Sequence, residues 1–246
     1  MPLADGSIIP NVAKIAVLRA NGLGDLIVAL PALDALRAAY PDAEIVLLAT
    51  AMHAALLRDR PGPVDRVVVV PPSRGVNGDD DTLEDPAALD AFFAELSRDR
   101  FDLALQFHGG GRNSNPFLLR LGARVTAGLR TPDAAPLDRC LPYVYFQPEI
   151  FRYLEAAALV GARPVGFTPR LAVIAGDLAE AEAVVPEDGR PLVALHPGAT
   201  DPRRRWPPAK FAAVGDRLAA SGARVVVTGT SEERPLVDAV RAAMRT

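Results

Sequence analysis

The 246-residue chain has few of the residues that define several classes of protein. Its single cysteine, Cys140, excludes an intrachain disulfide and a metal site built from cysteines. Its apolar runs fall short of the ~20 residues that cross a bilayer. The N-terminal residues lack the basic region and apolar core of a signal peptide. We therefore expect a cytoplasmic protein, with contact to the inner membrane face left open.

The sequence also lacks a strong excess of charge of either sign. Its formal net charge is −3, which gives no general attraction to nucleic acid. Half of its residues are apolar and 23% are charged, a composition typical of globular rather than disordered proteins. A cluster of arginines in such a chain is a local feature, and it indicates a binding site more than a track for a polyanion.

Predicted strands and helices alternate along the chain, which favours an α/β fold with parallel sheets covered on both faces. The consecutive valines at 67–70 predict a strand buried on both faces, and Pro31 predicts a kink or break in its helix. We expect residues 130–147 to be irregular. The predicted strands are 14–19, 44–49, 64–70, 101–107, 125–127, 192–196 and 223–228; the predicted helices are 25–39, 51–59, 87–98, 116–121, 149–160, 208–221 and 232–244.

The pattern predicts two domains. Residues 1–165 form an N-terminal Rossmann-like domain, residues 166–190 a linker, and residues 191–246 a partial C-terminal domain of the same kind. The second domain has only two strand–helix units, whereas sheets usually have ~4–6 strands. It is therefore predicted to be truncated or reduced.

The segment V-A-L-H-P-G-A-T-D-P-R-R-R-W-P-P-A-K-F carries the most chemistry. A strand ends at His196, and a turn of small residues, three arginines, Trp206 and a proline-started helix follow. Backbone N–H groups, a hydroxyl, guanidinium forks and a helix N-terminus near one point suit a diphosphate. A solvated basic helix entry is the alternative. Trp206 either stacks on a ligand or packs its helix onto the sheet.

Two further clusters follow predicted strands. Asp25 lies at the start of a helix after Asn21-Gly22-Leu23-Gly24, where a carboxylate either stabilises the helix or acts as a general base. His108 begins the glycine-rich stretch H-G-G-G-R-N-S-N. Ligands bind at the carboxyl ends of parallel strands, so these clusters are candidates for ligand contact. We interpret the acidic residues 79–81 as a solvated turn, and we assign no metal site.

Together these segments resemble glycosyltransferase family 9, the ADP-heptose:lipopolysaccharide heptosyltransferase family. Residues 14–33 look like its N-terminal signature of a strand, an arginine, small residues, L-G-D and a helix with A-L-P-A-L. Residues 196–211 look like its donor-site signature, H-P-G-A-[ST], a basic residue, W-P and a helix ending in F. The stretches D-L-A-L-Q-F-H-G-G-G-R-N-S-N and T-A-G-L also resemble the family, so the similarity covers nearly the whole chain.

The resemblance implies a GT-B fold, in which two Rossmann-like domains face a cleft. It implies inverting, metal-independent transfer of heptose from ADP-heptose to a saccharide or lipopolysaccharide-core acceptor, without a cofactor. Asp25 matches the family's general base. The donor-binding residues are then His196, Gly198, Thr200, Arg204, Arg205 and Glu233, and the acceptor-binding residues are Arg19, Asn21, Gly22, His108 and Arg112.

The chain also departs from the family pattern. Arg204 stands where the family usually has lysine, which replaces a point charge with a fork. A D-[ST]-G-x-x-H segment that helps to hold the donor is absent, so the resemblance implies that the chain binds donor poorly or not at all. Two alternatives stay open. One is a non-catalytic module that binds saccharide, and the other is a nicotinamide-dependent oxidoreductase, which the absence of G-x-G-x-x-G at 21–24 disfavours.

Overall fold

The computed structural model describes residues 6–79 and 81–245. Asp80, the middle residue of the acidic triplet, lies outside this part of the chain, as do residues 1–5 of the N-terminus. The chain divides into two compact units, Met1–Ile174 and Ala175–Thr246.

The first unit is built on a six-stranded sheet in which all neighbouring strands are parallel. The strand order is β3-β2-β1-β4-β5-β6. The order reverses between β1 and β4, and ligands of Rossmann-type sheets bind at this switch point, at the carboxyl ends of the strands. The strands are β1 (Lys14–Leu18), β2 (Glu44–Ala49), β3 (Arg66–Val69), β4 (Leu103–Gln106), β5 (Val125–Arg130) and β6 (Arg139–Pro142).

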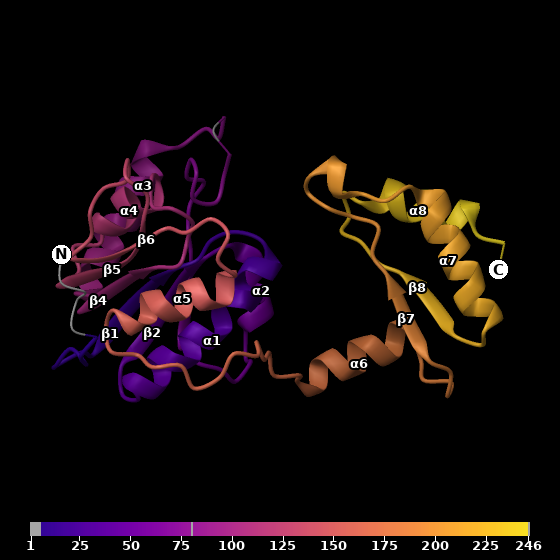
Figure 1. Cartoon of the computed structure of the whole chain (residues 1–246), viewed down its shortest axis with the longest axis horizontal. Helices are drawn as coiled ribbons and strands as arrows, with labels where there is room; N and C mark the ends of the chain where they lie inside the picture. Colours follow the sequence, from indigo (N-terminus) through magenta and orange to yellow (C-terminus); the bar gives the residue numbers. More distant parts are fainter. Residues whose placement is uncertain (1–5, 80, 246) are drawn as a thin grey trace. The chain divides into compact units, whose positions relative to one another are not determined.

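Helices cover both faces of this sheet (Figure 1). Strand β1 shows why, because its apolar side chains alternate between two cores. Ile15 and Val17 pack with α1 and α5, whereas Ala16 and Leu18 join the core formed with α3 and α4. The predicted α/β class with parallel strands is confirmed. The helices are α1 (Leu23–Ala39), α2 (Ala51–Leu57), α3 (Pro86–Leu96), α4 (Ser114–Leu119) and α5 (Glu149–Ala158), with a 3-10 turn at Ser97–Asp99.

The second unit contains two parallel strands, β7 (Leu192–Leu195) and β8 (Arg224–Val227). Leu195, Ala212, Ala223 and Val240 are its buried apolar residues. Figure 1 shows α7 and α8 lying beside these strands. The helical elements of this unit are α6 (Ala175–Val184), a 3-10 turn at Pro202–Arg204, α7 (Pro208–Ala220) and α8 (Arg234–Ala243).

Two expectations about the first unit are wrong. The valine-rich strand β3 is an edge strand that pairs with β2 alone, and Val69 keeps 46% of its surface exposed. The predicted burial on both faces therefore fails. Helix α1 also continues unbroken through Pro31. Proline inside a helix costs ~3 kcal/mol, and the burial of Leu30, Ala32 and their neighbours against the sheet and α5 offsets that cost.

Two elements lie where the sequence predicts none. Strand β6 falls inside residues 130–147, which were expected to be irregular; its four residues, R-C-L-P, are too few to show a periodicity. Helix α6 falls inside the predicted linker. It buries none of its side chains, so it lacks the apolar stripe from which an amphipathic helix is predicted.

The edge position of β3 predicts unequal costs for the same substitution. Val46 in β2 is fully buried and Val69 is half exposed. Val46→Ala should lower the free energy of unfolding by about 2 kcal/mol through lost burial and a residual cavity, whereas Val69→Ala should cost under ~0.5 kcal/mol. Urea unfolding of both variants measures the difference, and equal losses would contradict the assignment of β3 to the edge.

Candidate functional site

The carboxylate of Asp25 is fixed at the start of α1, directly after β1. The Gly22 N–H donates to its Oδ2 at 3.0 Å, and its Oδ1 lies 2.7 Å from Arg19 Nη2. The side chain nevertheless remains 41% exposed. Each carboxylate oxygen has more than one lone pair, so Asp25 can still accept a proton from a hydroxyl that binds beside it. Asp25 therefore fills the helix-start role, and its role as a general base stays a prediction.

Arg19 is 2% exposed, and its guanidinium points into the protein. Its Nε donates to the Asp25 carbonyl oxygen and its Nη1 to the Phe107 carbonyl oxygen, both at 3.0 Å. The side chain therefore ties together the end of β1, the start of α1 and the end of β4, at the switch point of the sheet. Arg19 is thus buried and fully engaged with these groups, and its direct contact with an acceptor stays a prediction.

Asn21, Gly22 and His108 line one pocket of about 490 Å³ at this edge of the sheet. The structure thus brings together three residues that the sequence indicates separately. Thr50, which caps α2, lines the same pocket, as does the loop segment 75–79. Sequence reasoning missed Thr50, although it directly follows β2 and so satisfies the same strand-end rule. It also assigned no role to the loop that contains Asn77 and Asp79.

His108 is buried in the wall of this pocket. Burial, together with the nearby charge of Arg19, lowers the pKa of its imidazole to about 4. With its amide oriented so that both polar atoms find partners, Asn21 donates to the Val76 carbonyl oxygen at 2.8 Å and to His108 Nε2 at 3.0 Å. A neutral imidazole in this position can exchange hydrogen bonds with a ligand, and it does not contribute a positive charge near neutral pH.

Arg112 is not one of the described residues that line this pocket. Its side chain is 81% exposed, and its Nε lies 3.8 Å from Asp133 Oδ2. Its contact with an acceptor stays a prediction.

In the second unit, three of the residues expected to bind the donor converge. His196 follows β7, and its Nδ1 lies 3.3 Å from the hydroxyl of Thr228 at the end of β8. Its Nε2 lies 3.8 Å from Glu233 Oε2. Gly198 lets the Glu233 carboxylate approach the backbone, because an added Cβ would lie 1.9 Å from Glu233 Oε1 and would displace that side chain. The Thr230 N–H donates to Glu233 at 2.9 Å, and this hydrogen bond holds the pKa of the Glu233 carboxyl below its usual range.

The three consecutive arginines have different partners. Arg203 pairs with Asp201, with Nη2 at 2.7 Å from Oδ2. Arg205 donates from Nε to the Ala199 carbonyl oxygen at 2.8 Å. The Arg204 guanidinium and the Thr200 hydroxyl are exposed and make no hydrogen bond within the described part of the chain. Arg204 is therefore the cation of this cluster that is most available to an anionic ligand.

Helix α7 contributes less to anion binding than the sequence suggests. Pro207 and Pro208 at its start have no N–H groups, and the Lys210 N–H donates back to the Pro207 carbonyl oxygen at 2.9 Å. The helix keeps its dipole but presents few of the donors that usually hold a phosphate. Trp206 packs edge-on against Phe211, with ring centroids 5.4 Å apart, which supports the packing role for this residue.

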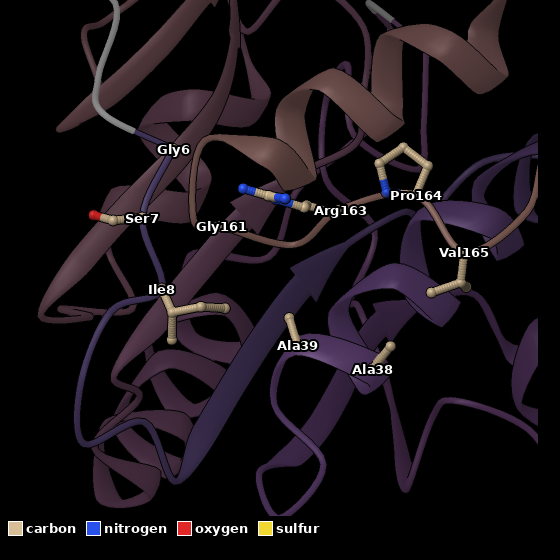
Figure 2. Close-up of a pocket in the computed structure, with 9 residues that line it drawn as sticks. All are labelled: Gly6, Ser7, Ile8, Ala38, Ala39, Gly161, Arg163, Pro164 and Val165. Carbon is tan, nitrogen blue, oxygen red and sulfur yellow. The ribbon is translucent and has the colours of Figure 1, made fainter.

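A second hollow of the first unit, of about 410 Å³, lies away from the switch point of its sheet (Figure 2). It is bounded by Ala38 and Ala39 at the end of α1 and by the segment 161–165 that follows α5. Because α1 begins beside the carboxyl end of β1, its last residues lie at the opposite edge of the sheet. Figure 2 shows Arg163 beside an otherwise mainly apolar wall. None of the predicted site residues lines this hollow.

Within residues 6–79 and 81–245, no group of three or more histidine, cysteine or acidic side chains is placed to hold a metal ion. In the same residues, no helix combines the length and the apolar character needed to cross a membrane.

Parallel α/β units with polar clusters at the strand ends are typical of Rossmann-like proteins, and comparison with known proteins identifies the family as one of glycosyltransferases. The sequence profile of glycosyltransferase family 9 (heptosyltransferase) matches residues 90–245, which is more than half of the chain. The chain belongs to glycosyltransferase family 9. This family membership argues against the alternative that the chain is a nicotinamide-dependent oxidoreductase. No curated protein sequence matches the chain significantly.

Solved structures of the GT-B type share the fold. A glycosyl transferase family 9 protein from Veillonella parvula DSM 2008 is 18% identical, with a TM-score of 0.74 over 95% of this chain and 67% of that one. Escherichia coli ADP-heptose lipopolysaccharide heptosyltransferase II is 20% identical, with a TM-score of 0.74 over 95% and 69%. E. coli heptosyltransferase WaaC with ADP is 17% identical, with a TM-score of 0.61 over 94% and 72%. The chain thus spans about two thirds of the length of these structures.

The environment of His108 predicts how it titrates. Its pKa is about 4 in the folded chain and about 6.5 in the unfolded chain. The unfolded state therefore binds more protons as the pH falls. The contribution of neutral His108 to the free energy of unfolding is fully present above pH 6.5 and is lost as the pH falls toward 4. An NMR titration of the histidine Cε1–H signals should show a midpoint for His108 near 4. A midpoint above 6 would contradict its burial in the pocket wall.

Proposed function

We propose that the chain provides the catalytic base and the diphosphate contacts of an inverting, metal-independent glycosyltransferase. The donor is a nucleoside-diphosphate sugar of the ADP-heptose type, and the acceptor is a saccharide such as the lipopolysaccharide core. The observation that carries this proposal is the Asp25 carboxylate, held by Gly22 and Arg19 at the switch point and still exposed beside a polar pocket. The family and the ADP in the WaaC structure support this choice of donor.

The proposed reaction is a single displacement. An acceptor hydroxyl attacks the anomeric carbon on the face opposite the diphosphate, so a new C–O bond forms while the bond to the diphosphate oxygen breaks. The hydroxyl proton passes to Asp25. The negative charge that develops on the departing diphosphate is stabilised by Arg204 and by the Thr200 hydroxyl, aided by Arg205. These groups take the role that a metal ion has in other sugar transferases, and no cofactor is required.

The first unit supplies the acceptor site in this proposal. Asn21, Thr50, Asn77 and neutral His108 offer amide, hydroxyl and imidazole groups to one pocket, and such groups suit the hydroxyls of a sugar. The second unit supplies the donor site, with Glu233 facing the nucleoside. We propose a cytoplasmic location, in contact with the inner membrane face, where a lipid-linked saccharide acceptor is presented.

A non-catalytic saccharide-binding module is the second candidate. It is favoured by the contrast between the six-stranded sheet of the first unit and the two-stranded sheet of the second. Donor binding separates the two candidates, because a transferase needs the nucleoside diphosphate and the module does not.

Asp25→Ala should abolish sugar transfer and leave ADP affinity within a few-fold of wild type, since the base and the diphosphate contacts lie on different units. Mass spectrometry of the acceptor measures transfer, and calorimetry measures ADP affinity. Strong loss of ADP binding in this variant would refute the assignment of Asp25 as the base.

Arg204→Ala should weaken ADP binding by about 1.5–3 kcal/mol, the usual loss for a hydrogen bond to a charged group. Arg203→Ala is the matched control, because Arg203 already pairs with Asp201 and Arg204 does not. The control should change ADP affinity much less. Equal effects of the two substitutions in the same titration would point to a diffuse basic surface instead of a site.

A further inference from the structure

Arg19 contacts a second carboxylate besides Asp25. Glu149 Oε2 lies 3.7 Å from Arg19 Nη2, the same nitrogen that lies 2.7 Å from Asp25 Oδ1. The Arg19 guanidinium also lies over the ring of Tyr153, 5.1 Å from its centroid. Glu149 and Tyr153 belong to α5, whereas Asp25 belongs to α1. One buried cation is therefore oriented from two helices.

Glu149 is itself held firmly. Its Oε1 pairs with the buried Arg152, and its Oε2 accepts a hydrogen bond from the Tyr153 hydroxyl. Burial raises the pKa of Tyr153 above its usual range, so this hydroxyl remains a donor throughout the physiological range. The carboxylate of Glu149 thus has little freedom to turn away from Arg19.

Arg152 extends the network to the loop before α5. Its Nη2 donates to the carbonyl oxygens of Val144, Tyr145 and Gln147 at 2.8, 3.0 and 2.7 Å. Along the network the charges alternate, from Asp25 through Arg19 and Glu149 to Arg152. The two arginines are buried, whereas the side chains of Asp25 and Glu149 keep 41% and 39% of their surface exposed. A buried charge is tolerated when it is paired and hydrogen-bonded, so Arg19 and Arg152 both restrict the position of Glu149.

We infer that Glu149 is a positioning residue for the transfer reaction. It acts through Arg19, whose guanidinium it orients from α5, and Arg19 in turn holds the Asp25 carboxylate toward the pocket. The inference rests on the proposed role of Asp25 as the base. Misplacement of a catalytic group by a fraction of an ångström to 1 Å lowers turnover severely, so this outer carboxylate should affect the rate more than donor binding.

Glu149→Gln is the direct test, because it removes the charge and keeps the shape. We expect kcat to fall about tenfold, with KM for ADP-heptose unchanged within about twofold. The side-chain ¹³Cγ resonance of Asp25 should also shift, which a role confined to stability would not produce. Glu155→Gln is the matched control, since Glu155 lies on the same helix outside the network, and it should change neither quantity.

Tyr153→Phe is the second variant if Glu149→Gln does not fold, because it removes one hydroxyl and keeps the ring under Arg19. It should move the Asp25 resonance in the same direction and lower kcat by a smaller factor. An unchanged Asp25 resonance and kcat in a folded Glu149→Gln or Tyr153→Phe variant overturns the inference. A wild-type chain that transfers no sugar refutes the proposed function instead, and the Asp25 resonance distinguishes the two failures.

Discussion

The ion pair between Arg19 and Asp25 is the interaction on which the candidate site of the first unit depends. A guanidinium that is 2% exposed needs compensating charge and acceptors, and the chain provides them from α1, α5 and the residue that follows β4. Meeting this need fixes the start of α1 against the end of β4, where the strand order of the sheet reverses. The same contacts leave an exposed carboxylate beside a polar pocket. The contacts that compensate the buried charge of Arg19 are thus the same contacts that fix the carboxylate of Asp25, the proposed base.

The candidate donor site of the second unit is built on fewer elements. Two strands and a turn of small residues bring His196, Gly198 and Glu233 together, and the Glu233 carboxylate occupies the space that a side chain at 198 would take. All three arginines that follow are exposed; Arg203 and Arg205 have local partners, whereas the Arg204 guanidinium has no hydrogen bond within the described residues. The three arginines are identical in sequence but differ in their hydrogen-bond partners. Their charge alone therefore does not show which of them contacts a ligand.

Much of the fold could be predicted from the sequence, because the central strands and their helices have clear apolar patterns and the site residues follow strand ends. The edge position of β3 could not, since a run of valines looks the same in a central strand and in an edge strand. Helix α6 could not, because it buries no side chain. The contact between Arg19 and Glu149 could not be predicted either, because the two residues are 130 positions apart in the sequence. The partners of Arg203 and Arg205 likewise depend on turn geometry that no short motif encodes.

Isothermal titration of the chain with ADP and ADP-heptose, with NAD as the control, tests the central claim most directly. The account predicts micromolar binding of the two ADP ligands and none of NAD, because we propose that Thr200, Arg204 and Arg205 of the second unit bind a diphosphate. Binding of NAD without the ADP ligands, or no binding of any of the three, would contradict the claim that this unit holds a nucleoside-diphosphate sugar.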